Sequence, residues 1–191
     1  MGRKVHPYGF RLKIIRDWQS RWYAEGRTYA DLLKEDRQIR ELVEKEMRSR
    51  AKDGQSSLSR VEIERFPPNQ VSVIIRTARP GVVIGRKGEN VKILRQSLEE
   101  LTGGKRVHVD VQEVETPDLD ARLVAENIVA QLERRIYHSR AMKRAVRQAM
   151  RAGAQGIKIV CSGRLSGSEM ARRETMREGR VPLQTLRADI D

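Results

Sequence analysis

Cysteine is almost absent from this chain of 191 residues, since Cys161 is the only one. One cysteine can form no internal disulfide and cannot supply the thiolates of a structural zinc site. Only three histidines occur, and they are scattered along the chain. Glu99 and Glu100 are helix neighbours that point apart, so they make no acid/base pair. We therefore predict that the chain is not an enzyme, needs no cofactor and binds no metal.

Long apolar runs are missing too. The most hydrophobic stretch, residues 71–75, is far too short to cross a bilayer. The opening MGRKVHPYGF is basic but has no apolar region after it, as a secretory signal would. The sequence thus predicts a cytosolic chain with no membrane partner. Cys161 fits the same reducing compartment, where it is expected to be a small core residue in an apolar strand.

Aromatic residues make up only 4% of the chain, which leaves little platform for stacking bases and disfavours an RRM-like reader. What the chain has in excess is basic charge. Lys and Arg number 39 against 26 acidic residues, a net charge of +13. This surplus favours a polyanion as partner, because neutralising phosphates releases condensed counterions. Composition alone also allows a basic enzyme that binds no polyanion.

The basic charge is concentrated in two tracts. Residues 1–28 carry a net charge of +5, and residues 140–180 carry +8 with eleven basic and three acidic side chains. Residues 29–55 are balanced. An N-terminal arm and a C-terminal face are therefore the predicted polyanion contacts.

Hydrophobic periodicity indicates an α+β chain, with a basic arm (1–28), a first domain (29–114) and a second domain (115–191) that begins near Pro117. The first domain is expected to contain a helix capped by Thr28 and interrupted around Glu35–Asp36. A hairpin of strands 58–65 and 70–77 follows, then a short helix at 80, a longer helix that ends at Gly103, and strand 106–114.

The second domain is expected to open with a helix that Asp118 or Asp120 caps and whose apolar stripe reaches Ile136. A second helix over 140–152, a strand over 157–161 and short β-like pieces, including 180–183, complete it.

The sharpest motif is a GxxG loop between two helices, Gly85-Arg86-Lys87-Gly88. Glycines let a backbone come close to a nucleic-acid strand, and the helix that follows directs free N–H groups at phosphate. Alone, GxxG also suits an ordinary helical turn. In this order of helices and strands it indicates a KH module. The spacing matches neither a P-loop nor a dinucleotide fingerprint.

A basic stripe is predicted on the second helix of the second domain. Arg140, Arg144, Arg147 and Arg151 recur at helical spacing, and Lys143 borders them. A solvated face is the simpler interpretation. Because no acidic residue occurs between Glu133 and Glu169, polyanion binding is favoured. The same basic region continues in five further arginines, Arg164, Arg172, Arg173, Arg177 and Arg180.

At this point the chain resembles the bacterial-type family of small-subunit ribosomal protein three. The resemblance lies in ordered blocks across nearly the whole chain, among them GRKVHPYGFRL, RPGVVIGRKGENV, LVAENIVAQLERR, RAMKRAV and REGRVPLQTLRADID. It implies a type II KH domain with a three-stranded sheet, then a second domain of two helices on a small antiparallel sheet. Family members usually continue with another strand, so the final strand is expected to be missing here.

The resemblance also implies a structural role in the head of the small ribosomal subunit. Its implied partners are small-subunit ribosomal RNA, messenger RNA and ribosomal proteins ten and fourteen. Basic residues of the RAMKR segment grip incoming messenger RNA in the family, which implies that role for Arg140, Lys143 and Arg144. Ser139 stands where many relatives have another basic residue, which is expected to weaken that grip.

The predicted RNA contacts come from the arm, the GxxG loop and the stripe. In the arm they are Arg3, Lys4 and Arg11. Localisation to the cytoplasmic ribosome follows, with an organellar ribosome of bacterial descent as the alternative. Two other functions stay open at this point: a KH regulator or nucleoid protein outside the ribosome, and an RNA-processing enzyme. The pattern does not tell whether the GxxG loop touches ribosomal RNA, messenger RNA or protein.

Overall fold

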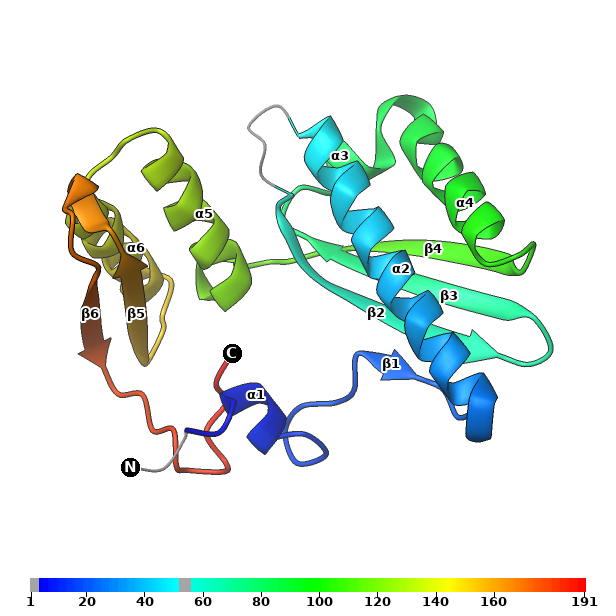
Figure 1. Cartoon of the computed structure of the whole chain (residues 1–191), viewed down its shortest axis with the longest axis horizontal. Coiled ribbons are helices and arrows are strands. Elements are labelled where there is room, and N and C mark those ends of the chain that lie inside the picture. The colour runs from blue at the N-terminus through cyan, green and yellow to red at the C-terminus, as the bar shows by residue number, and fades with distance from the viewer. Residues whose placement is uncertain (1–3, 52–55) are drawn as a thin grey trace. The chain divides into compact units, whose positions relative to one another are not determined.

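The computed structural model describes residues 4–51 and 56–191, and the chain folds as two compact units (Figure 1). One unit spans Trp18–Glu115. The other combines the N-terminal segment up to Asp17 with Thr116–Asp191. The division next to Thr116 lies close to Pro117, whereas the arm expected over residues 1–28 is shared between the two units.

The unit of residues 18–115 contains a four-stranded mixed sheet in the order β1-β2-β3-β4. Strands β2 and β3 form the predicted antiparallel hairpin, while β1 pairs with β2 and β4 with β3 in parallel. Three strands were expected, and β1 is the addition, because two residues are too short to show a period. The strands are β1 (Ser20–Arg21), β2 (Leu58–Phe66), β3 (Gln70–Thr77) and β4 (Arg106–Glu113).

The helices of this unit pack their apolar residues against one face of the sheet. Alternation along β3 places Val71, Val73 and Ile75 in the core, as a half-buried strand requires. His108 is exposed, as its register predicted. The helices are α2 (Gly26–Arg50), α3 (Pro80–Ile84), the 3-10 turn η1 (Arg86–Gly88) and α4 (Glu89–Leu101).

Helix α2 corrects two sequence expectations. Thr28 does not cap it: the N-cap is Glu25, and the Thr28 hydroxyl donates to the Glu25 carbonyl. The predicted interruption at Glu35–Asp36 is also wrong, since the helix is continuous. Asp36 is 3% exposed, and the partners that stabilise it inside the helix come from distant parts of the chain.

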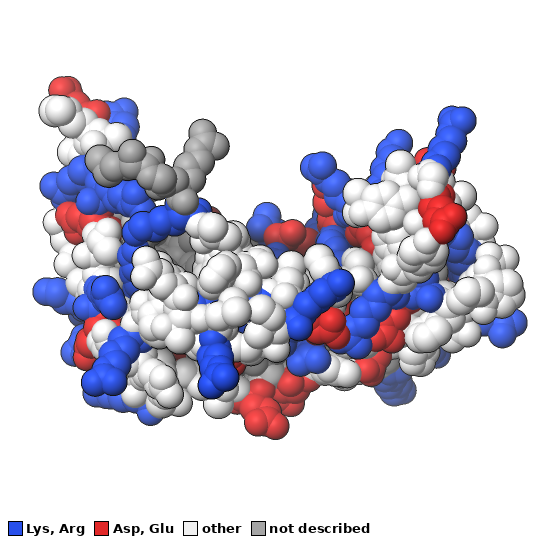
Figure 2. Space-filling view, turned by 90° about the horizontal axis from the view of Figure 1, so that it is seen from below, with Lys and Arg blue, Asp and Glu red and all other residues white. Residues whose placement is uncertain are grey.

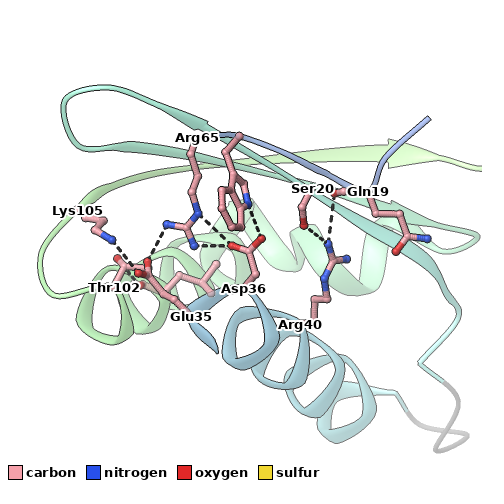
Figure 3. A network of polar contacts seen from close by, with 10 residues as sticks. Gln19, Ser20, Glu35, Asp36, Arg40, Arg65, Thr102 and Lys105 are labelled. Carbon is pink, nitrogen blue, oxygen red and sulfur yellow. Dashed lines mark hydrogen bonds and ion pairs between the residues drawn. The ribbon is translucent and has the colours of Figure 1, made fainter. Parts of the chain in front are cut away.

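These partners form the polar network of Figure 3. Asp36 accepts hydrogen bonds from the Trp22 indole at 2.8 Å and from Arg65 Nε at 3.0 Å. Arg65 also pairs with Glu35, which binds Lys105 at 2.7 Å. A buried carboxylate is tolerated only when it is paired and hydrogen-bonded. The network therefore joins α2, β2 and the turn before β4.

The second unit has the predicted architecture, two helices on a small antiparallel sheet. Its helices pack Ile128, Ala141 and Ala145 against Ile159 and Cys161 of the sheet. Asp120 caps the first helix by accepting from the Leu123 N–H. The elements are the turn η2 (Pro117–Leu119), α5 (Ala121–Glu133), α6 (His138–Arg151), β5 (Gly156–Gly163), the turn η3 (Leu165–Gly167) and β6 (Arg172–Gly179).

The β-like piece expected over residues 180–183 is wrong, and the strand that pairs with β5 lies just before it. It is β6, an eight-residue strand, and residues 180–183 belong to no strand. Six of the residues in β6 are polar or charged, so no apolar alternation marks it. Backbone pairing with β5 along its whole length forms the strand instead. On the inner side, burial raises the pKa of the Cys161 thiol, which agrees with a packing residue rather than a nucleophile.

Candidate nucleic-acid interface

The GxxG loop is a tight connection between α3 and α4 that depends on left-handed backbone. Gly85 has φ +68° and ψ −173°, and Gly88 has φ +76° and ψ 15°. Lys87 between them also has a positive φ, of 53°. Gly88 serves as the N-cap of α4 and supplies no side-chain cap, so the first N–H groups of that helix receive no side-chain acceptor from it. Such N–H groups suit a phosphate.

The two glycines are needed for different reasons. A Cβ at Gly85 would lie 2.4 Å from Asn90 Cγ, whereas a Cβ at Gly88 would meet nothing within 4 Å. Asn90 is held in place because its Nδ2 donates to the Val82 carbonyl at 3.1 Å. Gly85 is therefore required both by packing inside the loop and by its φ of +68° with ψ of −173°, a backbone conformation essentially confined to glycine. At Gly88 the space is open, and the backbone conformation is what favours glycine.

The surface around the loop combines charge with apolar side chains. Arg86 and Lys87 are exposed at its tip. Ile84 and Ile93, which flank it on α3 and α4, are 42% and 48% exposed. The structure thus brings together the four predicted residues of the loop and adds two isoleucines that the sequence reasoning missed. Their spacing fitted the apolar face of an ordinary helix, so the sequence did not indicate that these side chains are exposed.

Helix α6 presents the predicted basic stripe to solvent. All five cations, Arg140, Lys143, Arg144, Arg147 and Arg151, are exposed. The opposite side of the helix is buried, with Ala141, Met142, Ala145, Val146 and Ala149 in the core. No ion pair joins these cations to an acid among residues 4–51 and 56–191. Figure 2 shows one face of the molecule, with basic side chains spread over its surface.

The start of α6 is held by a residue to which the sequence assigned no role. His138 is 3% exposed, and its Nε2 lies 2.8 Å from Glu174 Oε2 on β6. Its Nδ1 lies 3.1 Å from the Ser166 hydroxyl in η3. The imidazole thus connects the helix to the strand and the turn, and it fixes the end of α6 where Arg140 lies. Ser139 beside it is half-buried.

The remaining predicted arginines separate in space. Arg164 is exposed, and its Nε donates to the Ser168 carbonyl at 3.0 Å. Arg172 lies 3.4 Å from Glu174, so part of its charge is compensated within the chain. Arg173 is the next residue along β6 and therefore points to the other face of the sheet. Neighbours in sequence are thus not neighbours on one surface.

The arm contains one clear correction. Lys4 is exposed, and Arg3 lies outside the described residues. Arg11 was predicted to touch RNA, but it is fully buried. Its guanidinium donates to the carbonyls of Pro7 and of four residues near the C-terminus, Pro182, Leu183, Thr185 and Ala188. With all its nitrogens engaged inside the protein, Arg11 cannot reach a phosphate in this structure.

Among residues 4–51 and 56–191, His, Cys, Asp and Glu side chains form no group of three suited to holding a metal ion. Over the same part of the chain, every helix is too short or too polar to cross a membrane.

Comparison with known proteins adds two family matches. Residues 38–119 match the KH domain, and residues 128–191 match the C-terminal domain of ribosomal protein S3. The chain is 54% identical over its full length to small ribosomal subunit protein uS3 of Dictyoglomus turgidum and spans 75% of that protein. The identity is 58% with uS3 of Halalkalibacterium halodurans and 53% with uS3 of Caldicellulosiruptor bescii, with 83% of each protein spanned. The chain belongs to the uS3 family.

Membership of the uS3 family confirms several predictions together. The resemblance to small-subunit ribosomal protein three is correct, and so is the α+β class with an N-terminal KH domain. The family is one of structural proteins, which confirms that the chain is not an enzyme. The matched KH domain includes the whole GxxG loop, and the matched C-terminal domain includes the whole of α6.

Proposed function

We propose that this chain is a structural constituent of the small ribosomal subunit that binds small-subunit ribosomal RNA in the head and lines the path by which messenger RNA enters. The relatives' printed name, small ribosomal subunit protein, supports the assembly. Its location follows as the cytoplasmic ribosome, or an organellar ribosome of bacterial descent. Ribosomal proteins ten and fourteen are the proposed protein neighbours.

The observation that carries the RNA proposal is the stripe on α6. Its five cations share one exposed helix face, and the described part of the chain offers them no acidic partner. Adjacent cations at helical spacing repel one another, so an anionic ligand stabilises the arrangement. Phosphates of RNA meet this requirement, and each one neutralised releases counterions. Arg140, Lys143 and Arg144 are proposed to contact messenger RNA.

The other proposed contacts follow from exposure. Ribosomal RNA contacts are assigned to residues on the surface or in the GxxG loop: Lys4, Gly85, Arg86, Lys87, Gly88, Arg147, Arg151, Arg164 and Arg173. Arg172 is assigned a minor contact, because Glu174 compensates part of its charge. Arg3 is kept as a proposed contact on the sequence prediction alone. The mechanism is electrostatic positioning, and no covalent bond of the RNA changes.

The test uses small subunits reconstituted with the full chain. Changing Arg140, Lys143 and Arg144 to alanine is expected to weaken messenger RNA binding by roughly tenfold or more at moderate salt and to lower the log–log salt slope by about three. The matched control changes Arg27, Lys34 and Lys45, three exposed cations of α2, to alanine.

Equal messenger RNA affinity for subunits with the α6 variant and for the control subunits would show that the stripe does not line the path. Sedimentation tests the assembly. A chain that stays in the light fractions at moderate salt, rather than migrating with small subunits, would favour a regulator outside the ribosome.

A further inference from the structure

The outer face of the β5–β6 sheet is a second basic surface, separate from the stripe on α6. Strand alternation places six side chains on this face: Lys158, Val160 and Ser162 of β5, and Arg173, Thr175 and Arg177 of β6. All six are exposed. The residues that alternate with them face the helices, among them Ile159 and Cys161.

The charges on this face are arranged unfavourably for an isolated protein. The register pairs Lys158 directly with Arg177, two cations with Cβ atoms about 5 Å apart. Arg173 lies on the same face, about 13 Å further along β6. No acidic residue belongs to the face. Over residues 4–51 and 56–191, these three side chains have no hydrogen bond or ion pair. Like charges directly opposite destabilise a sheet, so this pairing indicates a surface for an external anion.

The remaining side chains of the face indicate the kind of anion. The remaining positions of the face hold three short side chains, Val160, Ser162 and Thr175. None of the six side chains is aromatic, so the face offers no platform for stacking unpaired bases. Hydroxyl groups and cations together suit phosphate and the RNA 2′-hydroxyl. The partner that fits is a nucleic-acid backbone presented as a rigid double helix.

We propose that the outer face of the β5–β6 sheet, through Lys158, Arg173 and Arg177, docks on the backbone of double-helical RNA, while the α6 stripe serves a single strand. This proposal rests on the proposed function in one respect, that RNA is the polyanion. It assigns the sheet face its own ligand class and adds Lys158 and Arg177 to the contacts. Recognition here depends on shape and phosphate charge and carries no base sequence.

The experiment compares two RNA probes with the purified full chain across a salt series. One probe is a blunt RNA duplex of arbitrary sequence, and the other is oligouridine with the same total charge, each followed by fluorescence anisotropy. Vesicles that contain an anionic phospholipid serve as a third probe, followed by co-sedimentation. The sheet variant combines K158Q, R173Q and R177Q, and the stripe variant combines R140Q, K143Q and R144Q. The control variant combines R27Q, K34Q and K45Q, so that each variant loses three exposed cations.

We expect the sheet variant to bind the duplex roughly tenfold more weakly, with a log–log slope lowered by about three, and to retain its affinity for oligouridine. The stripe variant is expected to lose affinity for oligouridine and to retain its affinity for the duplex. A midpoint of thermal unfolding at or above that of the parent chain shows that the fold of the sheet variant is intact.

Three outcomes overturn the proposal: duplex affinity equal to that of the control variant, equal losses on both RNA probes, or a loss confined to the anionic vesicles. A parent chain that binds neither RNA at low salt contradicts the proposed function itself. Binding of both RNA probes with an inert sheet face contradicts only the docking surface.

Discussion

The unit of residues 18–115 and the unit that contains α6 use basic residues in opposite ways. In the first, arginines are partnered with acids: Arg65 binds Glu35 and Asp36 in a network that is largely buried. In the second, the cations of α6 and of the outer β5–β6 face are exposed and unpaired among the described residues. Positive charge therefore stabilises the fold at Arg65, whereas on α6 and on the outer sheet face it is available for a ligand, as it also is at the GxxG loop of the first unit.

The largest effect is expected at the centre of the paired network. Arg65→Met leaves Asp36 and Glu35 without their shared partner, and removing one partner of a buried ion pair costs about 3–5 kcal/mol. Urea unfolding measures the loss. Both tryptophans, Trp18 and Trp22, lie in this unit, so their fluorescence reports its unfolding.

Arg37→Met is the control for the Arg65 variant, because the Arg37 side chain is 82% exposed and its pair with Glu41 lies on the surface. That change is expected to cost less than about 1 kcal/mol. Similar losses for the two variants would contradict the role of burial.

The second-largest effect is expected at Arg11, which is buried although it belongs to the unit that contains α6. Arg11→Met removes hydrogen bonds to five carbonyls, and the carbonyls near the C-terminus lose their donor. A hydrogen bond to a charged group contributes about 1.5–3 kcal/mol, and the total stays below the cost at Arg65 because Pro182, Leu183 and Thr185 are exposed and water replaces the donor that they lose. Amide hydrogen exchange over residues 181–188 is expected to accelerate at least roughly tenfold. Lys4→Met, at an exposed side chain, provides the comparison and should leave these amides protected.

The third change is expected to stabilise the free chain, whereas the first two destabilise it. Arg144 lies four residues after Arg140 and three before Arg147, so it repels both. Arg144→Gln is therefore expected to stabilise the free chain by about 0.5 kcal/mol while it weakens RNA binding. In the other unit, Arg95 pairs with Glu99 four residues later at 2.9 Å, and Arg95→Gln should lose a few tenths of a kcal/mol, by the order of magnitude of such pairs. Thermal unfolding that shows the same sign for both changes would remove the contrast between the units.

The smallest effect concerns the opposed cations of the sheet. Lys158→Gln relieves the repulsion with Arg177 and is expected to stabilise the free chain by about 0.3 kcal/mol. Because the repulsion needs both charges, adding Arg177→Gln should give little more. Calorimetry on the two single variants and the double variant measures this non-additivity. Two independent, additive gains would show that the side chains do not interact.

Much of the fold could be read from local patterns. Alternating valines marked β4, the 3.6-residue period marked α5 and α6, and glycines marked the turns around Arg86 and Lys87. These signals are local because each depends on residues a few positions apart. By contrast, β6 has mostly polar side chains and exists through pairing with β5, so its position depended on a distant segment. The short strand β1 depends likewise on β2.

What the amino-acid sequence determined by itself was the amount and local spacing of positive charge: the surplus of Lys and Arg, the GxxG loop and the helical stripe on α6. What the tertiary structure decided was the use of each charge. Arg11 became a buried donor to the C-terminal segment, and Arg172 and Arg173 were placed on opposite faces. The physical reason is that spacing places a side chain on an element, whereas burial and ion pairing depend on segments that only the fold brings together.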